Sequence, residues 1–387
     1  MTSPSLSPLA TGRDLPFVVG IGGSAGSVPA LQSFFEALPD ESGLSYVVVT
    51  HLAPDQESHL SEVLQAHTSL PVTQVTSPTA LEPDHVYVTA PGRTLLLEEA
   101  TLVPHSLEAP EERRSPIDQF FRSLAQAPVH PLGVVLSGSG TDGSVGLRAI
   151  TEAGGVVAAQ DPSEAEHSSM PRSAIEMSQV DFILPVAEMA RQLAKQRHVV
   201  RDLQVPTDPG ELNEEEQSVL AQIFDQVRAR TGHDFSQYKR STMLRRIHRR
   251  LHVHHISSFE EYLAYLKEHP SEATALQKDF LISVTNFFRD PEAFAALRDQ
   301  AVPNILRDKG RDDRVRVWVA GCATGEEAYS VAMVLMERAE SASVSVDQIQ
   351  VFATDIDEDA LATARRGRYP KPIESDVPPA YLDRFFQ

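Results

Sequence analysis

Six short apolar runs, separated by glycine turns and helical stretches, constrain the fold of this chain more than any other feature of its sequence. They span residues 17–21, 46–50, 85–90, 131–138, 154–161 and 180–186. The early, middle and late runs are apolar throughout rather than alternating, which is typical of parallel strands buried on both faces. Helical stretches such as 27–38 and 57–67 separate several of the runs, so the pattern predicts a doubly wound α/β domain with a parallel sheet. Residues 94–105 predict a β-hairpin added to this architecture.

The strand signal then stops, and the pattern becomes helical as far as about residue 300. A second α/β pattern begins with the apolar run at 314–320 and continues with a glycine loop, a helix, a strand at 349–355 and another helix. This pattern predicts a partial Rossmann-like domain after the helical one. The predicted domains are 15–200 for the first α/β domain, 201–300 for a linker and helical domain, and 301–387 for the second α/β domain.

Composition excludes several classes of protein. A formal net charge of -20 argues against nucleic acid as a partner, because phosphate binding requires a basic surface. The single cysteine, Cys322, excludes a disulfide framework and any multi-cysteine zinc site, and no metal site is predicted. No apolar run approaches the ~20 residues of a membrane helix, and the first residues do not resemble a signal peptide. We therefore expect a cytoplasmic protein with no membrane insertion.

The first apolar run leads into Gly22-Gly23-Ser24-Ala25-Gly26, which fits the G-x-S-x-G pattern of a serine nucleophile on a tight turn. Such a turn projects the Ser24 hydroxyl from a strand end beside a helix N-terminus, where N–H groups can stabilise an oxyanion. The alternative is a dinucleotide-binding turn. That interpretation requires an acidic residue at the end of the second strand. His51 stands there instead, so we favour the nucleophile.

A serine nucleophile requires a histidine base and an acid that orients it. His51 follows the second strand, and Asp142 lies in a glycine-bracketed loop after another apolar strand. Strand ends of a parallel sheet face one crevice, so Ser24, His51 and Asp142 form a candidate triad. Taken singly, His51 is more often a structural or exposed residue and Asp142 an Asx turn.

A basic stretch from Lys239 to Arg250 interrupts the acidic chain. Met243, Leu244, Ile247 and Leu251 recur at helical spacing, which predicts one core face and one positive face. A solvated face or an RNA-binding helix would explain the charge. In a chain of this acidity we favour docking onto an acidic protein surface.

Residues 316–333 predict a strand, a glycine loop and a helix. Gly321 and Gly325 allow close approach of a ligand, and Asp355 at the end of the next strand can accept ribose hydroxyls. This half-fold suits a nucleoside ligand such as S-adenosylmethionine or NAD. Glu326 and Glu327 are either ordinary first-turn acids or carboxylates that bind the cationic end of S-adenosylmethionine.

Residues 15–195 resemble the catalytic domain of the chemotaxis protein-glutamate methylesterases (CheB). The resemblance rests on VVGIGGSAGSVPAL, VVVTHLAP, HVYVTAPG, RRSPIDQFF, GVVLSGSGTDGSVGLRAI and AQDPSEAEHSSMPRSAI. It implies Ser24 as nucleophile, His51 as general base and Asp142 as its orienter, with no cofactor. The implied reactions are hydrolysis of glutamate methyl esters and deamidation of glutamine on the cytoplasmic helices of methyl-accepting chemoreceptors.

Residues 212–387 resemble the chemotaxis receptor methyltransferases (CheR), through DFSQYKRSTMLRRIHRRL, LISVTNFFRD, VWVAGCATGEEAYSVAM, VFATDIDEDALATARRGRY and YLDRFF. The resemblance implies S-adenosylmethionine as cofactor, with Thr285, Arg289, Glu327 and Asp355 as its contacts. The family continues beyond the position of Gln387, so it also implies an incomplete methyltransferase in this chain. Two other functions stay open: a receptor-docking signalling scaffold with vestigial sites, and an NAD-dependent oxidoreductase, which the histidine at position 51 disfavours.

Overall fold

The computed structural model describes residues 15–50, 58–106, 115–178, 180–196, 209–281, 285–307, 309–310, 313–342, 344–370, 373–374 and 376–387. The chain divides into two compact units, Met1–Phe280 and Leu281–Gln387. The first unit contains an α/β part and a group of helices. The second contains a smaller α/β part.

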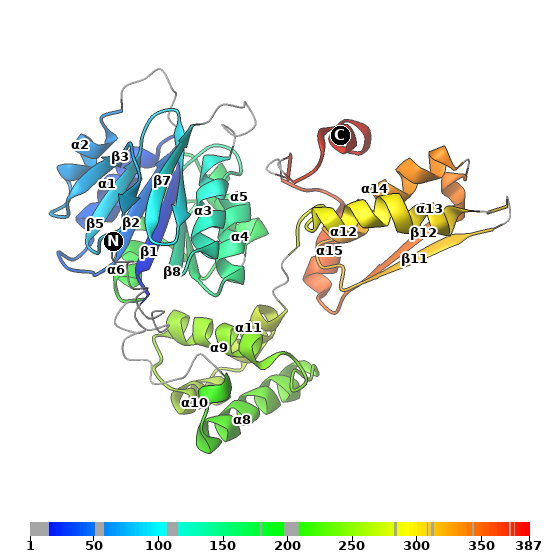
Figure 1. Ribbon diagram of the computed structural model, residues 1–387. Helices are drawn as coiled ribbons and strands as arrows, with labels where there is room; N and C mark the ends of the chain where they lie inside the picture. Colours follow the sequence, from blue (N-terminus) through cyan, green and yellow to red (C-terminus); the bar gives the residue numbers. More distant parts are fainter. Residues whose placement is uncertain are drawn as a thin grey trace, which may run out of the picture. The chain divides into compact units, whose positions relative to one another are not determined.

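A seven-stranded parallel sheet forms the centre of the first unit (Figure 1). Its strand order is β10-β9-β8-β1-β2-β5-β3, so strands are added on both sides of β1 and the sheet is doubly wound, as predicted. The strands are β1 (Phe17–Gly23), β2 (Ser45–Thr50), β3 (Val72–Val75), β5 (His85–Thr89), β8 (His130–Val135), β9 (Val156–Gln160) and β10 (Phe182–Leu184). The short strand β3 was not predicted.

Two groups of helices cover the sheet. One group is α1 (Ser27–Glu36), α2 (Leu60–Gln65) and α6 (Val186–Ala194); the other is α3 (Pro116–Gln126), α4 (Ser144–Glu152) and α5 (Ser169–Met177). Alternate side chains of β2 face opposite ways, because Tyr46 packs against aromatic rings of α1 while Val47 and Val49 join the core beneath α3 and α4. This two-sided burial explains the uninterrupted apolar runs.

Two glycines of β1 allow α3 to pack directly on the strand. A Cβ at Gly20 would lie 2.9 Å from ring atoms of Phe120 and Phe121, and one at Gly22 would lie 2.4 Å from Cγ2 of Ile117. These glycines therefore serve helix–sheet packing rather than the turn itself.

The predicted hairpin is confirmed. Strands β6 (Arg93–Glu98) and β7 (Thr101–Ser106) pair antiparallel. Together with β4 (Thr79–Ala80) they form a separate three-stranded sheet instead of extending the parallel one.

Helices α8 (Glu214–Thr231), α9 (Arg240–His254), α10 (Phe259–Glu268) and α11 (Pro270–Phe280) make up the rest of the first unit. The start of α8 is fixed by a capping box between Asn213 and Glu216. Met243, Leu244, Ile247 and Leu251 of α9 are all buried, which confirms its predicted core face.

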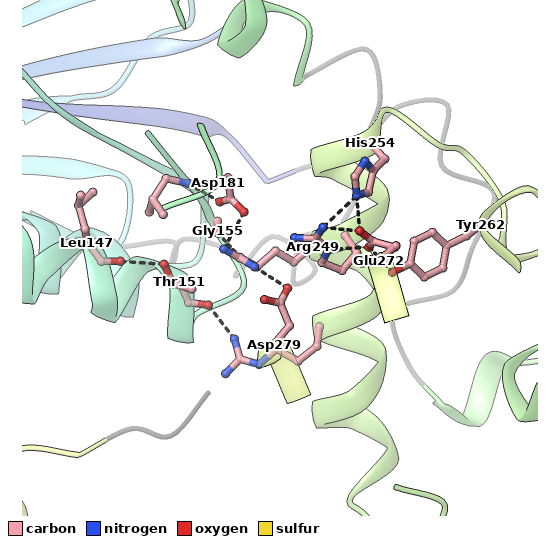
Figure 2. Close-up of polar contacts among 12 residues, drawn as sticks. Leu147, Thr151, Gly155, Asp181, Arg249, His254, Tyr262, Glu272 and Asp279 are labelled. Carbon is pink, nitrogen blue, oxygen red and sulfur yellow. Dashed lines mark hydrogen bonds and ion pairs between the residues drawn. The ribbon is translucent and has the colours of Figure 1, made fainter. Parts of the chain in front are cut away.

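The opposite face of α9 differs from the prediction, because two of its arginines are buried against the α/β part (Figure 2). The Arg249 guanidinium pairs with Asp181 (2.8 Å) and with Asp279 of α11 (2.5 Å), and its Nε donates to the Gly155 carbonyl (3.1 Å). Arg246 donates to the carbonyl of Thr151 at the end of α4 (2.7 Å). These two arginines are thus committed to contacts within the chain and do not belong to a free positive stripe.

The second unit is built on two parallel strands, β11 (Val315–Ala320) and β12 (Ile349–Thr354), joined by α14 (Glu326–Ser341). The predicted strand–loop–helix–strand pattern is therefore confirmed. Further helices of this unit are α12 (Pro291–Ala296), α13 (Val302–Leu306), α15 (Glu358–Arg366) and α16 (Pro379–Phe385).

Candidate active site and cofactor loop

Ser24 lies in the turn that joins β1 to α1. Its N–H donates to the carbonyl of Ser137 (3.0 Å), and its own carbonyl accepts from the N–H of Ser27 (3.0 Å), the first residue of α1. Gly26 closes the turn in the left-handed region, with φ of 70°. The half-buried serine is therefore held at the carboxyl end of a core strand, beside the positive end of a helix.

The fully buried Ser137 ties three loops together around this turn. Its N–H donates to Oε1 of Gln160 at the end of β9 (2.8 Å), and its hydroxyl donates to the Ala25 carbonyl (2.9 Å). The same hydroxyl accepts from the N–H of His167 (2.9 Å). The loops that follow β1, β8 and β9 thus hold one another in place at this edge of the sheet.

The serine turn stands where the strand order reverses. Strand β1 lies between β2 and β8, with Gly23 in register with Thr50 and Gly22 in register with Val135. Ligands of doubly wound folds bind in the crevice at such a switch point. The next residue after β2 is His51, which lies outside the described residues, so its predicted role as base stays a prediction.

Asp142 lies in the loop after β8 and is 5% exposed. Its Oδ1 accepts from the N–H groups of Asp118 (2.9 Å) and Gly143 (2.9 Å), and its Oδ2 accepts from the N–H of Ile117 (3.0 Å). Two of these donors belong to the first turn of α3, so Asp142 caps that helix from outside. Three N–H donors and the helix dipole stabilise a carboxylate in one fixed orientation.

Sequence reasoning missed a second carboxyl group beside Asp142. Asp118 is 2% exposed, and burial followed by the charge of Asp142 raises its pKa well above the ordinary value. An acid in the first turn of a helix is common, so nothing in the sequence distinguished Asp118. The signal appears only when α3 and α4 are packed together.

The glycine loop of the second unit encloses a carboxylate. Oδ2 of Asp355 accepts from the N–H of Ala323 (2.7 Å), and its Oδ1 accepts from the N–H of Asp357 (2.9 Å). Gly321 and Gly325 have φ values of 71° and 101°, and a Cβ at Gly321 would meet no atom of the described residues within 4 Å. The loop is open there to a ligand, and a half-buried acid stands beside it.

The other predicted cofactor contacts flank this loop. Glu327 is exposed in the first turn of α14. Thr285 and Arg289 belong to a segment that packs on the same helix, because the N–H of Phe288 donates to Oγ of Ser330 (3.2 Å). The roles of Thr285, Arg289 and Glu327 as cofactor contacts stay predictions, and Asp355 accepts a hydrogen bond from the loop backbone.

Within the described part of the chain, no group of three or more His, Cys, Asp or Glu side chains could hold a metal ion. None of the helices described is both long enough and apolar enough to cross a bilayer.

The fold and the serine turn define a doubly wound α/β protein with its candidate site at the switch point of the sheet. A helical part and a second α/β part with a glycine loop follow it in the chain. Three family models match the chain: CheB methylesterase over residues 19–193; CheR methyltransferase, all-alpha domain, over 218–281; and CheR methyltransferase, SAM binding domain, over 283–387.

Relatives in several bacteria match this chain over different shares of its length. A Rhodobacter capsulatus protein, "Uncharacterized 104.1 kDa protein in hypE 3'region", is 33% identical over 352 residues, which is 84% of this chain and 36% of that protein. A Leptospira interrogans "Putative protein-glutamate methylesterase/protein-glutamine glutaminase" is 32% identical over 44% of this chain and 89% of its own length. "Chemotaxis protein methyltransferase 2" of Pseudomonas aeruginosa is 34% identical over 42% of this chain and 57% of its own length.

One solved structure, the Thermotoga maritima CheB methylesterase catalytic domain, matches with a TM-score of 0.43 and 26% identity over 46% of this chain and 98% of that one. The chain belongs to the protein-glutamate methylesterase (CheB) family, with CheR methyltransferase domains fused after the esterase domain. The chain spans 36% of the length of the Rhodobacter capsulatus relative, which matches 84% of this chain.

Proposed function

We propose that the CheB domain hydrolyses methyl esters of glutamyl side chains on methyl-accepting chemoreceptor helices, and deamidates glutaminyl side chains there. The observation that carries this proposal is the placement of Ser24 and Asp142 after two neighbouring strands at the switch point of the sheet. The names of the relatives support the choice of substrate.

The reaction follows from these positions. The Ser24 hydroxyl attacks the ester carbonyl carbon while His51 accepts its proton. The charge on the carbonyl oxygen is stabilised by N–H groups near the start of α1 and in the exposed loop at Ser139. His51 then protonates the departing methoxide, and methanol leaves. Water, deprotonated by His51, cleaves the acyl-enzyme to glutamate and restores the serine. With a glutaminyl substrate, ammonia leaves instead of methanol.

Asp142 acts through His51. A carboxylate fixed by three backbone N–H groups can hold the imidazole in one tautomer and stabilise the imidazolium that forms during the reaction. Its rigidity matters because a misplaced orienter leaves the base in the wrong tautomer.

We propose further that the CheR part binds S-adenosylmethionine through Thr285, Arg289, Glu327 and Asp355. The residues fit such a group: the loop is open at Gly321, and Asp355 is fixed beside it with oxygens that can accept ribose hydroxyls. Glu327 is exposed in the first turn of α14 and can pair with the cationic end of the ligand. When bound, this cofactor supplies a methyl group for transfer. Both proposed activities require a cytoplasmic location, because the receptor helices in question lie there.

The experiment is a methanol-release assay on a methylated receptor fragment. Wild type should release methanol, and Ser24→Ala should lower the rate by at least about a thousandfold. Ser77→Ala is the matched control, since it removes an exposed serine hydroxyl between β3 and β4, outside the proposed site. Wild-type protein that is folded yet releases no methanol from a verified substrate would contradict the proposal and favour a receptor-docking scaffold.

A further inference from the structure

Two carboxyl groups cap each other's helices behind the serine turn. Asp142, in the loop before α4, accepts the N–H groups of Ile117 and Asp118 at the start of α3. Asp118, in the first turn of α3, accepts the N–H of Gly146 in the first turn of α4 through its Oδ1 (2.6 Å). The helices approach so closely that a Cβ at Gly146 would lie 3.1 Å from the Asp118 backbone. The two carboxyl groups are therefore forced together.

The two groups differ in how well their charges are stabilised. Asp142 has three N–H donors, whereas Asp118 has one, and Oδ2 of Asp118 is buried without a hydrogen-bond partner among the described residues. Burial and the charge of Asp142 raise the pKa of Asp118, and the N–H of Gly146 and the charge of Arg122 on α3 oppose this rise without cancelling it. Two adjacent buried carboxylates do not both ionise, so the proton belongs on the group with fewer donors.

We propose that Asp118 is a positioning residue of the esterase, whose protonated carboxyl donates to Asp142 and fixes it as the anion that orients His51. The inference rests on the proposed function, because it assigns Asp118 a part in the same site. Loss of the Asp118 proton would place two negative charges side by side and displace Asp142 from the N–H groups at the start of α3. The base, His51, would then no longer be held in one tautomer. Esterase activity should therefore fall as pH rises through the pKa of Asp118.

The test compares Asp118→Asn with Asp118→Ala in the full chain. The asparagine keeps an acceptor for Gly146 and a donor for Asp142 but cannot lose a proton, whereas the alanine loses both contacts. We expect Asp118→Ala to lower kcat/KM for methanol release about ten- to hundredfold, as expected for losing a buried hydrogen bond in the site. Asp118→Asn should restore most of that activity and should lack the fall with rising pH that we expect of wild type.

A fall in wild-type activity with rising pH that persists in Asp118→Asn, or wild-type rates and pH profile in Asp118→Ala, would overturn the proposal. A second measurement is independent of activity. The pKa of Asp118 in the folded protein lies above its unfolded value of about 4. Wild type therefore loses stability as pH rises from the unfolded pKa to the folded pKa, and Asp118→Asn does not. The midpoint of urea unfolding of Asp118→Asn relative to wild type should then increase with pH.

A constant difference between the two midpoints would overturn the inference even if the protein proved to have no esterase activity. Wild type could release methanol while its differences from Asp118→Asn in stability and activity do not change with pH. That result would overturn the role of Asp118 alone and leave the proposed function intact.

Discussion

Arg249 of α9 and Asp181, which precedes β10, form an ion pair of 2.8 Å in which the two side chains are 1% and 2% exposed. The same aspartate accepts the N–H of Val157 in β9 (2.9 Å), so one carboxylate links the parallel sheet to the helical part (Figure 2). The first helices of the CheR-like region are thus joined to the esterase domain by buried, hydrogen-bonded charges. We infer that the two parts unfold together.

Replacement of Arg249 by methionine should therefore destabilise the whole first unit. The change leaves the buried carboxylates of Asp181 and Asp279 without their counter-ion, which costs about 3–5 kcal/mol. Urea unfolding followed by circular dichroism measures the loss. Arg240→Met, at the exposed start of the same helix, is the matched control and should change stability by less than about 0.5 kcal/mol. Equal stabilities of the two variants would show that the ion pair does not hold the parts together.

Glu272 of α11 should make stability depend on acid pH. Burial alone would raise its pKa, but hydrogen bonds from His254 and Arg250 outweigh burial and lower the pKa to about 2 (Figure 2). A carboxyl with a lowered folded pKa stabilises above its unfolded value near 4.5, and this contribution is lost as pH falls toward 2. Glu272→Gln should cost about 2–3 kcal/mol at pH 7 and much less near pH 2.

The comparison requires unfolding curves of wild type and Glu272→Gln across that pH interval. Glu268→Gln, an exposed acid at the end of α10, serves as the charge-matched control. A deficit of Glu272→Gln that stays the same from pH 7 to pH 2 would refute the assigned cause.

Gly22→Ala should damage both stability and catalysis, although residue 22 makes no polar contact with substrate in the proposed mechanism. The new Cβ would lie 2.4 Å from the fully buried Ile117 side chain, and the Ile117 N–H holds Asp142. Overpacking of this kind costs about 1–3 kcal/mol, and the shift of α3 moves the orienter as well. Thermal unfolding and methanol release measure the two effects. Gly310→Ala, whose Cβ would meet only Asp313 at 3.4 Å, should change neither.

Asp355→Asn should weaken S-adenosylmethionine binding about tenfold, because the amide offers one acceptor where the carboxylate offers two oxygens. The single tryptophan of the chain, Trp318, reports on the site. Its Nε1 donates to Oγ1 of Thr354 (3.0 Å), the residue before Asp355. Fluorescence titration with the cofactor gives the affinities. Glu358→Gln, an exposed first-turn acid of α15, controls for the loss of charge. Equal affinities for wild type and Asp355→Asn would remove Asp355 from the site.

The parallel sheet and the serine turn could be predicted because each depends on local pattern. Apolar runs indicate the long strands, and the topology rule for parallel sheets predicts that Ser24 and Asp142 lie at one edge of the sheet. The short strand β3 was not predicted, because its sequence, VTQV, is only partly buried and carries little apolar signal.

The role of Asp118 and the burial of Arg249 could not be predicted from the sequence. Each depends on a contact between elements distant in the chain: α3 with α4 for Asp118, and α9 with β9 and its neighbours for Arg249. An amphipathic basic helix has the same sequence pattern whether its arginines face water or a buried carboxylate. Only packing shows that Arg246 and Arg249 have partners inside the chain.

The most direct test of the account is covalent labelling of the nucleophile. A serine-directed fluorophosphonate should modify the full chain at one site, and mass spectrometry of the digest should place the adduct on Ser24. His51→Gln should abolish labelling and Asp142→Asn should slow it, whereas Ser77→Ala should label as wild type does. An adduct on any other serine, or no adduct on a protein that releases methanol, would contradict the claim that Ser24 carries the esterase reaction.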